Sequence, residues 1–236
     1  MELYYVPELP DGEHRLDEQE SRHCAQVLRR QPGDRIKLTN GLGGAYEAVL
    51  TEVGRKACYF EIEKQEERVD SAPPIALAVA PTKNATRFEW LLEKATEIGV
   101  REIYPLISKH SERRKGNLER WNKVLVSAMK QSARVYLPRL HGWLKFQDLL
   151  KLDYPTRMIA HCDSERSRKA LRHIKPSTDS KVLIAVGPEG DFDGSEIEGA
   201  EAAGFESVHL GDARLRTETA GIVALHTLVL ASNCQA

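Results

Sequence analysis

The first 65 residues alternate apolar and polar positions over short stretches, which is the pattern of half-buried β-strands. The clearest stretch is residues 35–39, and residues 45–50 and 57–62 repeat it with glycine-rich turns between them. A short helix is expected near residues 17–29, where Ala25 and Leu28 would share one face. Short strands joined by tight turns predict a small β-barrel.

Residues 65–74 are charged and then proline-containing, with little to bury. We interpret this segment as a linker at a domain boundary. The predicted domains are residues 1–70, a small barrel, and residues 71–236.

Beyond the linker, apolar runs alternate with helical stripes. Residues 75–80 are continuously apolar, as in a strand that is buried on both faces. Further strands are expected at residues 103–107, 157–160, 182–186 and 208–210, and helices at residues 86–98, 118–132, 197–203 and 218–230. This alternation predicts the α/β class, a parallel sheet with helices on both faces.

The composition excludes several classes of protein. A formal net charge of −1 excludes a polycation that coats nucleic acid, although it allows local basic patches. Four cysteines, at positions 24, 58, 162 and 234, lack metal-binding spacing and are typical of reduced thiols in the cytoplasm. No signal peptide or apolar run of about 20 residues is found. We expect a cytoplasmic protein with no metal and no membrane partner.

Basic residues gather in three places along this nearly neutral chain. They are residues 109–115, residues 166–175 and the stretch from Arg22 to Lys37. A single cluster is more often a solvated face, but three clusters indicate segregated charge and favour a nucleic-acid partner.

Unusual residues follow three of the predicted strands. They are His161-Cys162-Asp163, Gly187 to Asp191, and Gly211 to Ala220. Ligands of open parallel sheets bind at the carboxyl ends of strands, and Gly187 and Gly190 would expose backbone to a flat heterocycle. The alternative is a plain strand-to-helix turn in which Asp193 or Ser195 caps the helix. Dinucleotide and triphosphate motifs are absent.

Arg214 and Arg216 stand directly before an apolar helix that Thr217 can cap. We expect both arginines to be buried or half-buried at the mouth of the core. Guanidinium groups in such a position need partners or a ligand.

At these residues the sequence resembles the RsmE family of ribosomal RNA methyltransferases. The matching motifs are Glu93 to Val100, Gly187 to Gly190, and Leu210 to Ala220, with weaker matches at His23, Val27 to Arg29, Pro32 to Asp34, Gln131 and Arg134. Together they cover nearly the whole chain. Asp191 is a departure, because many members have a second glycine there.

The resemblance implies a SPOUT-class α/β domain with a C-terminal trefoil knot, preceded by a PUA-like barrel that binds RNA. It implies a homodimer that uses S-adenosylmethionine to methylate N3 of a uridine in 16S ribosomal RNA of the small subunit. Ile222 to Leu230 cover more than one helix face, as a dimer helix would, but a buried core helix explains this equally well.

Residue roles follow from the motifs and the resemblance together. The expected cofactor-binding residues are His161, Gly187, Pro188, Glu189, Gly190, Leu210, Gly211, Arg214, Leu215, Arg216, Thr217, Thr219 and Ala220. The catalytic candidates are Arg216 and Arg134, which would stabilise the uracil anion, with Glu97 or Glu218 orienting them. The expected RNA-binding residues are Arg22, His23, Arg29, Arg30, Gln131 and Arg134.

The sequence also allows two alternatives. A related knotted methyltransferase could act on another RNA, such as transfer RNA, or on a ribose 2′-hydroxyl. A non-catalytic RNA-binding or ribosome-assembly factor could keep the fold, although such a protein has no need of a cofactor loop.

Overall fold

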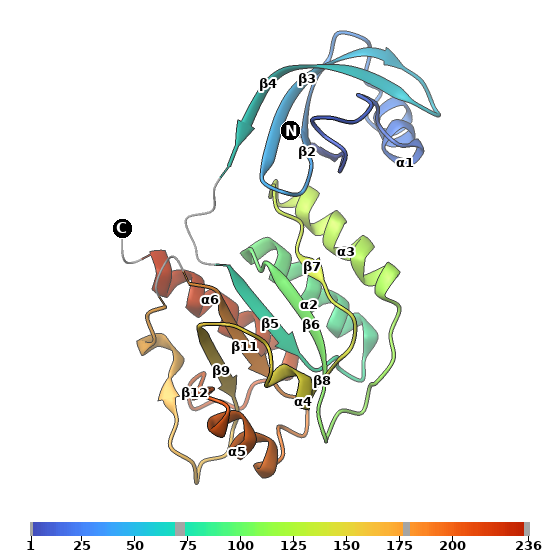
Figure 1. The fold of residues 1–236 in the computed structure, drawn as a ribbon. Helices are drawn as coiled ribbons and strands as arrows, with labels where there is room; N and C mark the ends of the chain where they lie inside the picture. The colour runs from blue at the N-terminus through green and yellow to red at the C-terminus, as the bar shows by residue number, and fades with distance from the viewer. Residues whose placement is uncertain (1, 69–73, 177–179, 234–236) are drawn as a thin grey trace. The chain divides into compact units, whose positions relative to one another are not determined.

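The computed structural model describes residues 2–68, 74–176 and 180–233. The chain divides into two compact units (Figure 1). Unit 1 comprises Met1–Val69 and Val126–Leu137, and unit 2 comprises Asp70–Leu125 and Pro138–Ala236. The sequence predicts residues 126–137 in the second domain. Their contacts with the barrel explain the difference, since Thr39 Oγ1 donates to the carbonyl of Val135 at 3.3 Å and Lys130 pairs with Glu20.

Unit 1 is built on a four-stranded sheet in the order β1-β2-β3-β4. The strands are β1 (Leu3–Tyr5), β2 (Arg35–Thr39), β3 (Gly44–Val53) and β4 (Cys58–Glu67). Only β1 and β2 pair in parallel; the other pairs are antiparallel. Alternate side chains such as Ile36, Leu38, Leu50 and Phe60 fill one core, which confirms the small barrel-like sheet.

The linker prediction is wrong at residues 65–67, which belong to β4. These residues are exposed, so they show no alternation in the sequence, yet their backbone pairs with β3 at Gly44, Ala45 and Tyr46. Backbone pairing needs no apolar side chain. Residues 69–73 of the predicted linker lie outside the described residues.

The helix expected at residues 17–29 is two shorter elements. Helix α1 (Glu18–Arg22) starts after Asp17, whose carboxylate accepts from the backbone N–H of Glu20 at 2.7 Å. A π-helix, η1 (His23–Val27), continues it. Arg29 adopts a left-handed φ of 53°, so the helix ends before it.

Unit 2 holds an all-parallel sheet in the order β10-β12-β9-β11-β5-β6-β7, with β8 also paired to β6. Five strands match the expected ones: β5 (Ile75–Val79), β6 (Glu102–Ile107), β9 (Thr156–Ala160), β11 (Val182–Val186) and β12 (Glu206–His209). Three two-residue strands were not predicted: β7 (Arg139–Leu140), β8 (Leu144–Lys145) and β10 (Lys169–Ala170).

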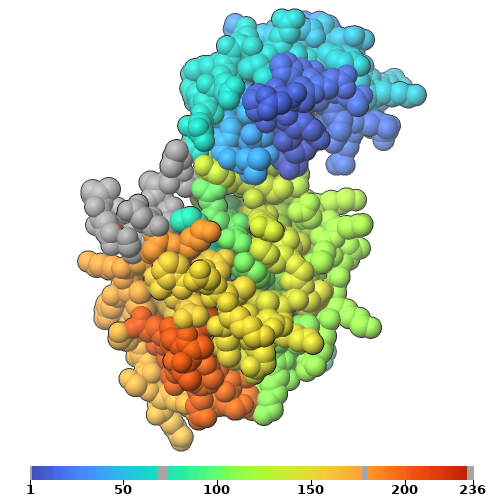
Figure 2. Space-filling model, viewed as in Figure 1, coloured from blue at the N-terminus to red at the C-terminus, as the bar shows by residue number. Residues whose placement is uncertain are grey.

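Helices cover both faces of this sheet, which confirms the α/β class (Figure 1). The helices beyond β5 are α2 (Ala85–Ile98), α3 (Leu118–Gln131), α4 (Phe146–Leu149), the short 3₁₀ helix η2 (Leu171–His173), α5 (Gly194–Ala202) and α6 (Thr217–Asn233). Residues 126–131 of α3 belong to unit 1. On one face, α4 and α5 bury Phe146, Ile197 and neighbouring apolar side chains. The atoms of α4 (yellow) and α5 (orange-red) adjoin there (Figure 2).

On the other face, α2 and α6 pack closely against each other. A Cβ at Gly221 would lie 2.9 Å from Leu91 Cδ1, so glycine permits this close approach. Phe88 of α2 packs against Trp121 of α3, with ring centroids 4.7 Å apart. The predicted stop of α2 at Gly99 is confirmed by its left-handed φ of 106°. The expected knot stays a prediction.

Candidate functional site

Three loops meet at one edge of the sheet in unit 2. Strands β12, β9 and β11 are direct neighbours and run parallel. Their carboxyl ends therefore lie together and lead into residues 210–216, 161–163 and 187–193 respectively. The sequence does not give the order of these strands; the structure makes them neighbours and so brings the three loops together.

Asp191 ties two of these loops together. Its Oδ2 accepts a hydrogen bond from the backbone N–H of Cys162 at 2.7 Å, and its Oδ1 accepts from the N–H of Phe192 at 2.8 Å. Asp191 has a φ of 62°, a left-handed conformation that Asp adopts more readily than most residues. The sequence left the role of this residue open, and the structure gives it a structural one.

The loop after β11 is a tight turn that begins at Gly187. A Cβ there would lie 3.2 Å from the backbone nitrogen of Phe192 and 3.3 Å from the carbonyl carbon of Asp191. Further along, Glu189 Oε1 accepts from the backbone N–H of Lys83 at 3.0 Å, which ties the loop to the segment before α2. Pro188 is buried, whereas Glu189 and Gly190 are exposed.

The alternative reading of the same loop is also correct in part. Asp193 caps α5 by accepting from the backbone N–H of Ser195 at 3.1 Å. Glu196 completes a capping box by accepting from the N–H of Asp193 at 3.0 Å. The helix starts at Gly194, earlier than the expected residue 197, because this cap organises its first turn.

His161 stands out at the end of β9. It is 4% exposed, and neither ring nitrogen has a hydrogen-bond partner among residues 2–68, 74–176 and 180–233. Burial lowers the pKa of His161, while the negative charge of Asp191 opposes that shift. An unpaired polar group inside a protein is costly, so the imidazole is a strong candidate to contact a polar ligand.

The loop after β12 differs from the expectation in one respect. Arg214 and Arg216 are exposed rather than half-buried. Arg216 directly precedes α6, and its carbonyl accepts a hydrogen bond from the N–H of Ala220 at 2.7 Å. Gly211 opens the loop with a φ of 120°, which favours glycine.

The start of α6 places further predicted residues beside this loop. Thr217 is buried and is the first helical residue rather than the cap. Glu218 is also buried and lies 3.7 Å from Arg87 Nε. Leu210, Leu215, Thr219 and Ala220 are half-buried.

Other predicted residues have partners of their own. Glu97 accepts from Lys94 Nζ at 2.8 Å on α2. In unit 1, Arg22 pairs with Glu18 at 2.7 Å, His23 with Glu2 at 2.6 Å, and Arg30 lies 3.9 Å from Asp34. Arg29 is exposed and has no ion pair within the described ranges. Gln131 and Arg134 belong to unit 1, whereas the three loops belong to unit 2.

A fourth segment, after β6, holds the loop that follows β11, and the sequence did not indicate this. His110 Nδ1 lies 3.2 Å from the carbonyl oxygen of Gly190 and 3.1 Å from that of Asp191. Lys109 Nζ donates to Asp193 Oδ2 at 2.7 Å. The basic run at residues 109–115 was visible in the sequence, but its contacts depend on which strands are neighbours.

Two further features of the described chain bear on the kind of site. No helix in it has the length and apolar character needed to cross a membrane. The side chains described there also form no group of three His, Cys, Asp or Glu that could hold a metal ion.

Comparison with known proteins places the chain in a family. Residues 70–229 match the model of the RNA methyltransferase domain, and residues 16–63 match that of the RNA methyltransferase PUA domain. The ribosomal RNA small subunit methyltransferase E of Mesomycoplasma hyopneumoniae is 37% identical to this chain, over 76% of this chain and 79% of that protein.

Among the solved structures that this chain resembles, two illustrate the extent of the match. A probable rRNA-methyltransferase from Porphyromonas gingivalis superposes with a TM-score of 0.92 at 40% identity and covers 100% of both chains. Ribosomal RNA small subunit methyltransferase E from Neisseria gonorrhoeae, bound to S-adenosyl methionine, gives 0.85 at 30% identity over 95% of each chain. On these matches, the chain belongs to the RsmE family of RNA methyltransferases.

Proposed function

We propose that the chain is an S-adenosylmethionine-dependent methyltransferase that methylates N3 of a uridine in 16S ribosomal RNA. The family membership supports RNA methylation, the names of the relatives support the small-subunit RNA, and the Neisseria relative is bound to this cofactor. The choice of N3 rests on the resemblance of the sequence motifs.

The observation that carries the proposal is the edge formed by the loops after β9, β11 and β12. Asp191 joins the loop after β11 to the loop after β9 through a 2.7 Å hydrogen bond from the N–H of Cys162 to its Oδ2. The buried imidazole of His161 has no hydrogen-bond partner within the part of the chain that is described. Gly187 keeps the middle loop tight against Phe192. These features fit a ligand that offers polar groups to the backbone and to His161.

For the cofactor-binding residues we keep the set predicted from the sequence. They are His161, Gly187, Pro188, Glu189, Gly190, Leu210, Gly211, Arg214, Leu215, Arg216, Thr217, Thr219 and Ala220. When bound, S-adenosylmethionine supplies an electrophilic methyl group on a sulfonium sulfur.

Within this proposal, Arg216 stabilises the negative charge that develops on uracil when N3 loses its proton. Its guanidinium is exposed and makes no ion pair inside the described ranges, so it is free to meet a substrate. A cation placed where charge develops lowers the barrier. Arg134 is a second candidate for this role.

Glu97 and Glu218 are the proposed orienting residues. Glu97 lies 2.8 Å from Lys94 Nζ and Glu218 lies 3.7 Å from Arg87 Nε. Glu218 is the better placed of the two in sequence, because it is two residues from Arg216.

Unit 1 would bind the RNA backbone and set its register. The residues proposed for this are Arg22, His23, Arg29, Arg30, Gln131 and Arg134. Arg29 is the first of these to test, because it has no ion pair among the described residues, whereas Arg22, His23 and Arg30 contact Glu18, Glu2 and Asp34 respectively. A homodimer and a cytoplasmic location complete the proposal, and light scattering tests the former.

Titration calorimetry with S-adenosylmethionine tests the proposed function against a non-catalytic RNA-binding factor. The proposal predicts saturable heat with one site per chain. Absence of heat at millimolar cofactor would favour the binding factor. If the cofactor binds, the modified nucleoside then separates a uridine N3 target from a ribose 2′-hydroxyl or another RNA.

A further inference from the structure

Ion pairing distinguishes the two basic clusters of unit 2. In residues 166–175, Arg166 donates to Asp163 at 3.0 Å and to Glu198 at 2.7 Å, and Lys169 pairs with Glu206. Arg168 donates to the carbonyl of His161 at 2.7 Å. Much of this cluster's charge is therefore already neutralised or committed.

The other cluster, residues 109–115, contains three cations that have no carboxylate partner among the described residues. Lys109 pairs with Asp193 at 2.7 Å, and the cluster's own carboxylate, Glu112, pairs with Lys83 at 2.9 Å. Arg113, Arg114 and Lys115 have no carboxylate within 4.0 Å among the residues that the structure describes. We call these three residues the basic triad.

Backbone carbonyl groups hold the two arginines of the triad in place. Arg113 Nε donates to the carbonyl of Lys115 at 3.0 Å. Arg114 Nε donates to the carbonyl of Ser111 at 3.3 Å, and its Nη2 donates to that of Lys109 at 3.4 Å. Each guanidinium keeps further N–H groups for a ligand, and holding it beforehand reduces the entropy lost on binding.

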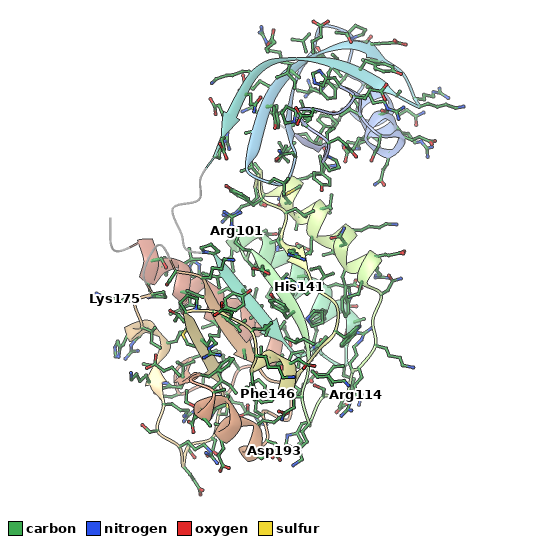
Figure 3. The ribbon with its side chains drawn as sticks, in the orientation of Figure 1. Arg101, Arg114, His141, Phe146, Lys175 and Asp193 are labelled. Carbon is green, nitrogen blue, oxygen red and sulfur yellow. The ribbon has the colours of Figure 1, made fainter. Side chains whose placement is uncertain are left out.

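The segment that carries the triad is fixed to the loop after β11. Lys109 N–H donates to Glu196 Oε1 at 2.8 Å, and the imidazole of His110 contacts the Gly190 carbonyl at 3.2 Å. A buried turn in which Ser108 N–H donates to Ser111 Oγ at 3.0 Å stiffens it. Arg114 and Asp193 lie at the same end of unit 2, away from Arg101 (Figure 3).

We propose that Arg113, Arg114 and Lys115 bind backbone phosphates of the substrate RNA beside the loop Gly187–Asp191. This inference rests on the proposed function. Guanidinium groups match the geometry of phosphate oxygens, and no carboxylate among the described residues competes for them. The triad lies at the carboxyl end of β6, at the sheet edge that holds the proposed cofactor loops, so it would hold the RNA strand next to the reacting base.

The test compares two triple variants of the full chain. One is Arg113→Gln, Arg114→Gln and Lys115→Gln. The matched control is Arg139→Gln, Lys175→Gln and Lys181→Gln, three exposed cations of unit 2 that lie outside the segment after β6 and have no ion pair among the described residues. Both variants lose the same number of positive charges, so a difference between them reports position rather than net charge.

Binding of 16S ribosomal RNA is measured by filter binding at several salt concentrations. For the triad variant, the slope of log affinity against log salt falls in magnitude by about 2, and affinity at about 0.1 M salt falls at least tenfold. The control variant shows less than half of that change in slope. Equal slopes for the two variants, or no salt dependence in the wild type, would overturn the proposal.

Cofactor affinity separates this proposal from the proposed function. Both variants are expected to bind S-adenosylmethionine within about twofold of the wild type, since the triad is not among the cofactor-binding residues. A wild-type chain that gives no heat with the cofactor refutes the proposed function, whereas normal heat together with an unchanged salt slope refutes only the triad. Loss of cofactor heat in the triad variant alone would also overturn the proposal. The triad would then affect methyl transfer by holding the cofactor loop Gly187–Asp191 and not by binding RNA phosphates.

Discussion

The carboxylate of Asp191 accepts the backbone N–H of Cys162 at 2.7 Å, and so joins the loop after β11 to the loop after β9. Both loops belong to the proposed cofactor site. Many members of the resembled family have glycine in this position, which has no side chain to make such a bond. In this chain, a side chain fixes the distance between the two loops.

Replacing Asp191 tests this relationship. Asp191→Gly keeps the left-handed backbone without strain but removes the acceptor, and Asp191→Asn keeps an acceptor without the charge. Since a hydrogen bond to a charged group contributes about 1.5–3 kcal/mol, we expect cofactor affinity to fall at least tenfold for Asp191→Gly and less for Asp191→Asn. Calorimetry measures both; equal affinity in all three proteins would remove Asp191 from the site.

Burial of His161 predicts a pH dependence of stability. Its pKa in the folded chain lies below the ordinary value of 6.5 because burial disfavours the charged form. As pH falls below about 6.5, the unfolded chain takes up this proton first, so stability is present above that pH and declines below it. The decline stops once the pH passes the folded pKa.

Urea unfolding at pH 7.5, 6.5 and 5.5 measures this effect. His161→Phe should lose less stability than the wild type between pH 7.5 and 5.5, and His173→Gln, at an exposed position, should behave like the wild type. An identical loss in the wild type and His161→Phe would show that the imidazole does not titrate as expected.

Arg216→Ala tests the proposed stabilisation of the uracil anion. The side chain is exposed, so the thermal midpoint should stay close to that of the wild type. Removing one group that stabilises developing charge costs about 10²–10³ in kcat. Methyl transfer to 16S ribosomal RNA is measured under single-turnover conditions, with Arg172→Ala as the control. A single-turnover rate constant within a few-fold of the wild-type value would exclude Arg216 from the mechanism.

The ion pair between Glu20 and Lys130 ties residues 126–137 to the rest of unit 1. Burial raises the pKa of Glu20, and Lys130 opposes that shift. Lys130→Met leaves the buried carboxyl group of Glu20 without its ion-pair partner and should lower the free energy of unfolding by about 3 kcal/mol. The double variant Glu20→Leu with Lys130→Met should recover most of that loss. Denaturant unfolding decides; a double variant as unstable as Lys130→Met would mean that the loss comes from packing.

The sequence predicted the long elements of unit 2 because their apolar positions are continuous or periodic, as in residues 75–79 and 85–98. It missed β7, β8 and β10, since two residues show no period. It also placed residues 126–137 in the second domain. The apolar positions of α3 predict a helix but do not show that Lys130 pairs with Glu20 of unit 1.

The three loops were predicted as candidate ligand-binding segments because ligands of parallel sheets bind at the carboxyl ends of strands. That the three strands are neighbours came from the structure. The tie from Asp191 to Cys162 was not predicted, since it joins residues 29 positions apart. The predicted burial of Arg214 and Arg216 was wrong. A residue that precedes an apolar helix can be buried or exposed, because the apolar character of the helix does not determine where the preceding side chain points.

In the proposed function, this edge of unit 2 serves methyl transfer to N3 of a uridine in 16S ribosomal RNA. In the most direct test, the purified chain is incubated with methyl-deuterated S-adenosylmethionine and with small ribosomal subunits from cells that lack the protein. The nucleosides of the 16S ribosomal RNA are then analysed by mass spectrometry. The prediction is one deuterated 3-methyluridine per 16S molecule. No label, or label on a different nucleoside, would contradict it.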